Sequence, residues 1–245
     1  MIDFHTHIMP EIDDGSSSEY ESVQLLKTLR EQGVDKVLLT PHFYAYSSSA
    51  ETFDELRESS LKALMEALSD TPLDVELYLG CEVYYFEELW RVEKLKDFCI
   101  KGTDYILIEM PFSAWTDSMV RGIEKIIGKG ITPIIAHFER YISYGNMSKI
   151  YELIEMGALL QMNCDYINRF ATRRKAIKLI KKDIVAVLGS DCHNMDKRRP
   201  EYLSAVDHLR KKLSKERFNR FFSFQKRILS KAEPVYAQKQ NKIHK

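Results

Sequence analysis

The chain has 245 residues, of which 36 are basic, 36 are acidic and 44% are hydrophobic. This composition excludes a disordered protein, and the balanced charge argues against a protein that lives on nucleic acid, which usually has a basic excess. There is no apolar run of the roughly 18 residues that a membrane helix needs, and the N-terminus has no basic or apolar leader. The four cysteines form no CxxC pair. We therefore expect one large core in a cytoplasmic protein with reduced thiols and no membrane insertion.

Short apolar runs alternate with segments of helical period along the chain. Helix 51–69 shows the clearest stripe, and Gly33, Gly130 and Gly157 each follow a helical stretch, where a left-handed cap is favoured. The runs predict seven strands, at residues 2–4, 37–39, 75–79, 105–108, 131–136, 158–162 and 184–188. Most are continuously apolar, as expected for parallel strands covered on both faces. The pattern predicts an α/β fold and favours one barrel, although an open doubly wound sheet gives the same alternation.

The last third of the chain is less regular. Residues 201–213 and 215–232 are predicted to be helices, and the second has an apolar face that we expect to pack on the barrel, with a partner-binding helix as the alternative. That face comprises Phe218, Phe221, Phe222, Phe224, Ile228 and Leu229. Residues 233–245 are polar and lack periodicity, so we expect a single domain over 1–232 and a disordered tail over 233–245.

Titratable side chains follow nearly every predicted strand. Because the chemistry of a parallel barrel lies at the carboxyl ends of its strands, these residues are expected to meet. They include five of the chain's seven histidines and four carboxylates: His5, His7, Asp14, His42, Glu82, Glu109, His137, Asp191 and His193. So many buried carboxylates would repel one another and lose hydration, a cost that divalent cations remove. The sequence therefore predicts a metal site.

The ligand types narrow the choice of metal. Imidazole and carboxylate without a thiolate cluster suit manganese, iron or zinc. His5 and His7 are two apart on one extended segment, so their rings point the same way, and the two oxygens of Glu82 can bridge two ions. Nine candidate ligands fit two or three ions, an arrangement that favours hydrolysis of phosphate esters.

Two arginines follow these ligands, and guanidinium groups match phosphate oxygens. Arg140 comes after His137, and Arg198 lies on the last loop, although each has a surface ion pair as its plainer interpretation. Cys192 to Arg198 also has the Cys-x5-Arg spacing of thiol phosphatases. We reject that mechanism because the loop lacks glycine and Asp191 opposes formation of a thiolate.

The motifs together resemble the PHP (polymerase and histidinol phosphatase) superfamily, and more narrowly the bacterial metal-dependent tyrosine-protein phosphatases encoded with capsule and exopolysaccharide genes. The resemblance covers residues 1 to about 230 in motif order. The matching elements are His5-x-His7, Asp13-Asp14-Gly15, His42, Gly80-x-Glu82-Val83-Tyr84, Ile108-Glu109, His137-x-Glu139-Arg140-Tyr141 and Asp191-x-His193-Asn194. It implies a distorted seven-stranded TIM-like barrel with a trinuclear site, commonly of manganese, held by the nine residues above.

The resemblance also implies the reaction. A metal-bridging hydroxide would attack the phosphorus of phosphotyrosine while Arg140 and Arg198 hold the phosphate. Arg199 stays open as the alternative to Arg198, because residues 196–200 depart from the family's usual Asp-Gly-Arg-Pro. Any general acid would be a histidine of the site, such as His42, or Asp191. The expected substrate is the tyrosine-rich tail of a membrane-anchored kinase that controls polysaccharide export.

Three other functions stay open at this point. A small-molecule phosphomonoesterase acting on a compound such as histidinol phosphate would use the same site. A metal-stabilised scaffold that only binds the kinase tail would not need an open multinuclear site. A 3′ exonuclease is disfavoured by the neutral charge and by the lack of alternating aromatic and basic residues. Phe43-Tyr44-Ala45-Tyr46 and Trp115 are candidates to border a peptide, with ordinary loop packing as the alternative.

Overall fold

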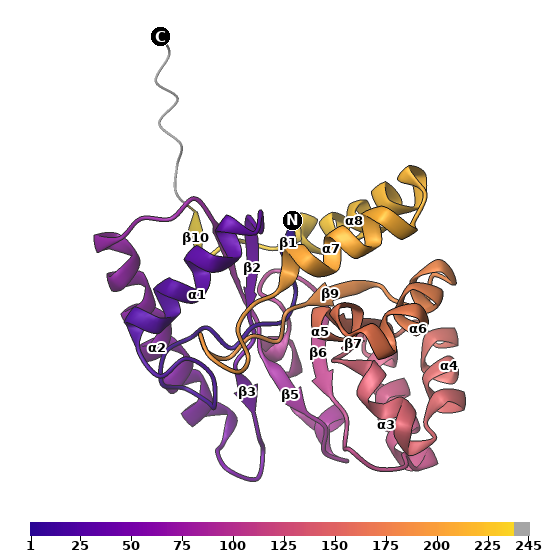
Figure 1. Ribbon diagram of the computed structural model, residues 1–245. Coiled ribbons are helices and arrows are strands. Elements are labelled where there is room, and N and C mark those ends of the chain that lie inside the picture. The colour runs from indigo at the N-terminus through magenta and orange to yellow at the C-terminus, as the bar shows by residue number, and fades with distance from the viewer. Residues whose placement is uncertain (238–245) are drawn as a thin grey trace.

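A computed structural model describes residues 1–237. Parallel strands form a curled sheet with helices on its outside (Figure 1). The strands are β1 (Ile2–Asp3), β2 (Lys36–Leu39), β3 (His42–Phe43), β4 (Glu76–Leu79), β5 (Glu82–Tyr84), β6 (Tyr105–Glu109), β7 (Thr132–Ile135), β8 (Leu159–Asn163), β9 (Val187–Gly189) and β10 (Tyr236–Ala237). The helices are α1 (Glu19–Glu31), α2 (Ala50–Asp70), α3 (Asp117–Gly128), α4 (Met147–Glu155), α5 (Cys164–Asn168), α6 (Phe170–Lys181), α7 (Tyr202–Lys212) and α8 (Lys215–Ile228). Short 3-10 segments are η1 (Leu89–Arg91), η2 (Leu95–Phe98), η3 (Phe138–Tyr144) and η4 (Leu229–Lys231).

The strands divide into two hydrogen-bonded sheets within residues 1–237. One has the order β1-β2-β4-β10, and the other has the order β3-β5-β6-β7-β8-β9 with every pair parallel. The two sheets follow one another because β2 continues into β3, and β4 into β5, after two-residue breaks. Pro41 lies in the first break, where a missing N–H removes one ladder hydrogen bond. Backbone hydrogen bonds from Gly80 N–H to Leu39 C=O (2.9 Å) and from Glu82 N–H to Pro41 C=O (2.9 Å) span the breaks.

The first and last parallel strands meet. Phe4 N–H donates to Leu188 C=O at 3.0 Å, and Thr6 forms a parallel bridge with Cys192. The predicted α/β fold is therefore confirmed, and its parallel strands form a curled sheet. The seven-stranded count of the predicted barrel is not confirmed, because of the interruptions described above. The predicted strand 184–188 is also shifted. Ile184 N–H still caps α6 by donating to Leu179 C=O, so β9 starts only at Val187.

The predicted helices and their ends are found in the structure. Gly33, Gly130 and Gly157 have φ values of 82°, 79° and 106°, as the predicted left-handed caps require. Helix α2 matches the predicted helix 51–69, and Phe221, Ile228 and Leu229 are buried in the core, so the second C-terminal helix packs on the sheet as expected. Within residues 1–237, no helix is long and apolar enough to cross a membrane.

The predicted disordered tail, residues 233–245, includes a segment that is ordered in the structure. Tyr236–Ala237 form β10, which pairs antiparallel with β4, and the Tyr236 hydroxyl donates to Leu73 C=O at 3.2 Å. Tyr236 also packs against the core, and this burial of an aromatic ring ties the segment to the sheet edge. The remainder of the predicted tail, residues 238–245, lies outside the described residues.

Candidate metal centre

All nine predicted ligands lie together at the carboxyl ends of the strands, and we call this set the centre. His5 and His7 follow β1, and their Nε2 atoms are 3.0 Å apart. Both rings are fully buried, and the bridge between Thr6 and Cys192 fixes the backbone between them. Two imidazole nitrogens at this separation face a common point. This geometry agrees with the prediction that alternation along an extended segment turns both rings the same way.

Glu82, the first residue of β5, lies in the middle of the centre. Its Oε2 atom is 3.0 Å from His5 Nε2, 3.3 Å from His7 Nε2 and 3.1 Å from His42 Nδ1. Its Oε1 atom is 3.0 Å from His137 Nε2. Burial raises the pKa of Glu82, but the surrounding His5 and His42 outweigh it and hold the pKa well below its usual range. One carboxylate thus contacts four imidazoles, as expected for a bridging ligand.

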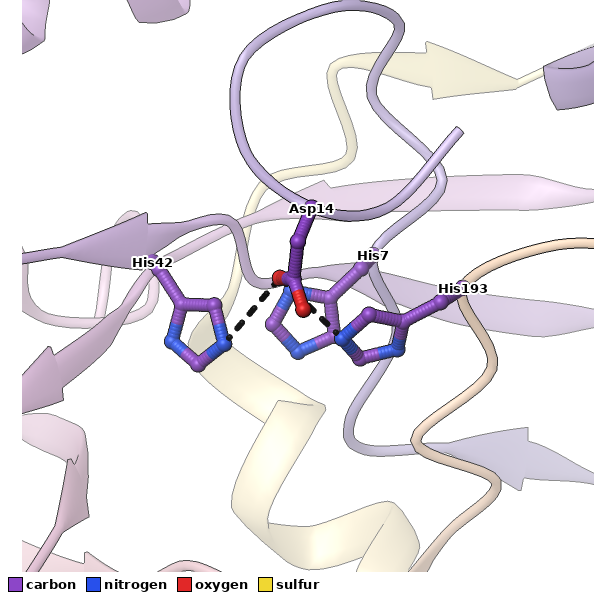
Figure 2. Close-up of side chains that lie close together, drawn as sticks. All are labelled: His7, Asp14, His42 and His193. Carbon is purple, nitrogen blue, oxygen red and sulfur yellow. Dashed lines mark ion pairs between the residues drawn. The ribbon is translucent and has the colours of Figure 1, made fainter. Parts of the chain in front are cut away.

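A second cluster forms above His7. Asp14 reaches over from the loop after β1, and its Oδ1 atom is 3.6 Å from His42 Nε2 and 3.4 Å from His193 Nε2 (Figure 2). His7, Asp14, His42 and His193 each offer one atom within 4.8 Å of the others. Unlike Glu82, the Asp14 side chain is 67% exposed. The second cluster is therefore the open side of the centre.

Asp191 and Glu109 complete the set. Asp191 Oδ1 lies 3.7 Å from His5 Nε2 and 3.6 Å from His7 Nε2. Glu109 Oε1 lies 3.5 Å from His137 Nε2, and its Oε2 lies 3.9 Å from His42 Nδ1. Three compatible groups of ligand atoms result: His7, Asp14, His42 and His193; His5, His7 and Glu82; and His42, Glu82 and Glu109.

Two buried nitrogen atoms of the centre lack hydrogen-bond partners and are available to bind a metal. His42 Nδ1 and His193 Nε2 are buried and lie 3.1 Å from Glu82 Oε2 and 3.4 Å from Asp14 Oδ1, respectively. Neither approach has hydrogen-bond geometry, and no other group of residues 1–237 bonds to them. Burial lowers the pKa of both histidines, which favours neutral rings with a free lone pair. A buried nitrogen without a partner is costly in a folded protein, whereas a neutral imidazole is the commonest metal ligand. The donor set suits divalent transition metals.

The backbone is strained at two members of the centre. His137 has φ 28° and Asp191 has φ 54°, both in the left-handed region that residues other than glycine rarely adopt. The strain is held by hydrogen bonds: Gln161 Oε1 accepts from His137 N–H at 2.6 Å, and His5 C=O accepts from Asp191 N–H at 2.8 Å. Such strain clusters at functional sites, where side-chain direction outweighs backbone preference.

Three supporting side chains were missed by the sequence analysis as functional residues. Asp13 Oδ2 is 2.7 Å from His7 Nδ1 and also accepts from His42 N–H at 2.9 Å. Gln161 Oε1 is 3.0 Å from His5 Nδ1, and the Tyr141 hydroxyl is 3.2 Å from His137 Nδ1. Partners on the second ring nitrogen fix the orientation and tautomer of a ligating histidine.

Some of these residues did carry a sequence signal. Asp13 and Tyr141 lie inside the motifs Asp13-Asp14-Gly15 and His137-x-Glu139-Arg140-Tyr141. The glycine of the first motif is needed, since a Cβ atom on Gly15 would lie 2.2 Å from His7 C=O and 2.8 Å from Asp13 Oδ1. Gln161 lies inside an apolar strand, with no signal of its function.

Both predicted phosphate-binding arginines lie against Asp191. Arg140 donates to Asp191 Oδ2, and Arg198 donates to Asp191 Oδ1 at 2.7 Å. Arg199 instead pairs with Glu201 at 3.4 Å. The structure thus brings Arg198 and not Arg199 to the centre. A hollow of about 580 Å³ opens beside the pair, and its lining includes Arg140, Asp191 and Arg198. Arg199 also lines this hollow, although it does not contact Asp191.

The charges around Asp191 explain its ionisation. Burial raises its pKa, but His5 and Arg140 outweigh that effect and keep it well below the usual range of an aspartate. Cys192 next to it is 1% exposed, and burial raises the pKa of its thiol above the ordinary value. The Cys-x5-Arg spacing is therefore not a thiol-phosphatase site.

Two aromatic groups have different positions. The ring of Tyr44 stacks on His42 with centroids 4.9 Å apart and lies 5.8 Å from Tyr84. Tyr46 is 79% exposed beside Tyr44. In contrast, Trp115 is 4% exposed and packs 5.1 Å from Tyr141, so it belongs to the core.

Comparisons with known proteins identify the family of the chain. The family model "Capsular polysaccharide synthesis, CpsB/CapC" matches residues 1–229. Tyrosine-protein phosphatase CpsB of Streptococcus pneumoniae is 32% identical over 232 residues, which cover 91% of this chain and 95% of that protein. Tyrosine-protein phosphatase YwqE of Bacillus subtilis (strain 168) is 30% identical over 227 residues, covering 88% and 86% of the two chains.

The fold has a close match among solved structures. A chain from the crystal structures of YwqE from Bacillus subtilis and CpsB from Streptococcus pneumoniae, described as unique metal-dependent tyrosine phosphatases, superposes with a TM-score of 0.84. The match covers 96% of this chain and all of the other at 24% identity, so it supports the fold.

Proposed function

The chain belongs to the CpsB/CapC family of capsular polysaccharide synthesis, and we propose that it is a metal-dependent protein-tyrosine phosphatase. The observation that carries the proposal is the convergence of four imidazoles on Glu82, beside two arginines that share Asp191. A phosphate monoester needs neutralisation of its charge and an activated water. The centre and its arginine pair provide the groups for both.

For the metal, we propose two or three divalent ions, with manganese as the first choice by family resemblance. The residues that would hold them are His5, His7, Asp14, His42, Glu82, Glu109, His137, Asp191 and His193. Seven of the nine form the three groups described above, and His137 and Asp191 lie beside these groups, next to Glu82 and His5. When bound, such ions supply the Lewis acidity that activates water and neutralises phosphate charge. Glu82, whose two oxygens face different imidazoles, would be shared between neighbouring ions.

The chain's own side chains would position the substrate. Arg140 and Arg198 approach Asp191 from the same hollow, so their remaining N–H groups can clamp a phosphate there. We assign Tyr44 and Tyr84 to the flank of the tyrosyl ring, because Tyr44 stacks on His42 at the edge of the centre. A phenolate leaving group, with a pKa of about 10, needs little protonation. It needs less protonation than an alkoxide would, and a histidine of the centre such as His42, or Asp191, would supply any proton.

We propose the tyrosine-rich tail of a membrane-anchored kinase of polysaccharide export as the substrate, and the cytoplasm as the compartment. The names of the relatives support a phosphotyrosine protein as the substrate, and the kinase tail rests on the family resemblance alone. The compartment is supported by four free cysteines, all buried and none disulfide-bonded, which is typical of a reducing environment.

Hydrolysis of a tyrosine-phosphorylated peptide and of histidinol phosphate tests the function. Each substrate is given to metal-stripped protein, to protein with added manganese, and to His7→Ala, with His208→Ala on α7 as the matched control outside the centre. We expect manganese-dependent hydrolysis of the peptide, far above the alkyl ester, lost in His7→Ala and kept in His208→Ala. Preference for histidinol phosphate would favour the small-molecule phosphatase. Metal binding without hydrolysis of either substrate would favour the scaffold.

A further inference from the structure

Helix α6 and the single residue on either side of it carry only basic charge. Residues 169–182 contain seven basic side chains and no acidic one, although the whole chain is neutral. The rest of the sequence therefore holds 29 basic against 36 acidic residues. Helix α6 lies on the outside of the fold beside α4 and α5 (Figure 1).

Five of these seven cations are exposed and form no ion pair in the part of the chain that the structure describes. Within residues 1–237, no ion pair is formed by Arg174, Lys175, Lys178, Lys181 or Lys182, all of which are exposed. The two carboxylates that border the helix are already engaged: Asp165 pairs with Arg169, and Asp183 pairs with Arg217 and Arg220. We call the five exposed cations and Phe170 the α6 face.

An apolar component lies along the same face. Phe170, the first residue of α6, is 90% exposed, in contrast to its neighbours Ile177 and Leu179, which are buried. A hollow of about 830 Å³ runs beside the helix and is lined by Phe170, Ala171 and Ile177, with Arg173, Arg174, Lys178, Lys181, Lys182 and Lys212 around them. The apolar side of α6 packs in the core, so Phe170 is the one large apolar side chain of the α6 face that can enter a lipid interface beside the cations.

We propose that the α6 face binds the surface of a membrane containing anionic phospholipids. Charge complementarity calls for an anionic partner, and four to eight Lys or Arg on an amphipathic helix is the pattern for anionic headgroups. Four of the five exposed cations are lysines, which act as point charges without the fixed fork of arginine. Such a row suits a diffuse sheet of headgroups better than the paired carboxylates of a specific protein interface. Binding at the surface needs no membrane-spanning helix.

This surface would place the centre close to the membrane. Arg169 lines the hollow beside Arg140 and Asp191, while the next residue, Phe170, lines the hollow along α6. The α6 face and the entrance to the centre therefore share the α5–α6 turn. A phosphorylated segment close to the bilayer would then lie near Arg140 and Arg198.

Sedimentation with vesicles tests the proposal. The manganese-loaded protein is mixed with vesicles of phosphatidylcholine alone or with phosphatidylglycerol at three parts in ten, at low salt and at high salt. We expect binding to the anionic vesicles only, weakened by salt. Neutralising Lys175, Lys178, Lys181 and Lys182 to glutamine should lower the partition coefficient at least about tenfold, since each cation near the surface contributes measurably. Phe170→Ser should lower it less.

A matched variant separates the helix from net charge. Lys62, Lys94, Lys101 and Lys129 are exposed lysines elsewhere, and changing them to glutamine removes the same charge. This control should bind vesicles as the unchanged protein does, and both variants should hydrolyse a soluble phosphopeptide normally, which also shows that they fold. Equal loss in the control, or equal binding to neutral vesicles, would overturn the proposal. So would capture by polyglutamate together with no binding to anionic vesicles, which would indicate an acidic protein partner.

Discussion

The centre and the α6 face handle charge in opposite ways. In the centre, Glu82 and Asp191 are buried, and each has cationic or imidazole groups within 4 Å. On α6, exposed lysines stand in a row without carboxylate partners within residues 1–237. An unpaired buried charge costs several kcal/mol, whereas water screens like charges at the surface. Folding therefore requires the buried charges of the centre to be paired. The unpaired positive charges on α6 cost little at the surface, so they can bind an anionic partner.

The largest effect is expected from removing the charge of Glu82, which pairs with the histidines of the centre. Glu82→Gln takes away the carboxylate that faces four imidazoles, so we expect fewer bound metal ions per chain and a loss of turnover of at least about a thousandfold. Metal analysis after gel filtration and phosphopeptide hydrolysis measure the two effects. Glu124→Gln, on the exposed face of α3, is the control. Normal metal content and turnover in Glu82→Gln would contradict the assignment of the centre.

The arginine pair comes next, because it lies between the buried centre and the solvent. Arg198→Ala should reduce kcat/KM for the phosphopeptide by about 10- to 100-fold, since it removes a charged hydrogen-bond donor beside the hollow. Arg199→Ala should change it by no more than about twofold, because Arg199 turns toward Glu201. Steady-state kinetics of the two variants at saturating manganese decide between them, and the opposite ranking would assign phosphate binding to Arg199, which also lines the hollow.

A substitution of Asp13 distinguishes a residue that orients a metal ligand from a residue that binds the metal. Asp13→Asn keeps the shape of the side chain but weakens its hold on His7, so we expect about 10- to 100-fold weaker manganese affinity. At saturating manganese most of the turnover should return. Titration of activity against free manganese measures this, with Asp70→Asn at the end of α2 as the control. If added metal restored nothing, Asp13 would have a direct role in the reaction.

The smallest effect is expected from thiol reagents. Burial raises the pKa of Cys81 and of Cys99 to about 12, from an ordinary value near 9. Because only the thiolate reacts, less than about 0.1% of each is reactive at pH 8, and reactivity should stay low until the pH passes 11. Phosphatase activity should therefore survive iodoacetamide at pH 8, and a thiol assay should detect the four cysteines only after denaturation. Rapid inactivation would reinstate a cysteine mechanism.

Much of the architecture and of the ligand set was predictable from local signals. Buried parallel strands have continuous apolar runs, and helix ends carry glycine, so the alternation of elements is readable in one dimension. Polar residues directly after such runs are recognisable as functional candidates, because burying a charged group costs free energy unless a partner or a metal compensates it. His5, His42, Glu82 and His137 were found in this way, and all lie in the centre.

Other features depended on the tertiary structure. The predicted runs end at the breaks, residues 40–41 and 80–81, so the short strands β3 and β5 beyond them were not predicted. Strand β10 forms only because Tyr236 pairs with the edge of β4. Gln161 reads as one more strand residue until its amide oxygen is seen beside His5 and His137 N–H.

The amino-acid sequence by itself determined which residue types stand at the ends of the strands, and hence the chemistry. Only the tertiary structure decided which of two neighbouring arginines turns to Asp191, and which cations on α6 are left without carboxylates. The physical reason is range. Periodicity and capping act within a few residues of the chain, whereas hydrogen bonds and ion pairs depend on distances of 3–4 Å between residues far apart in sequence.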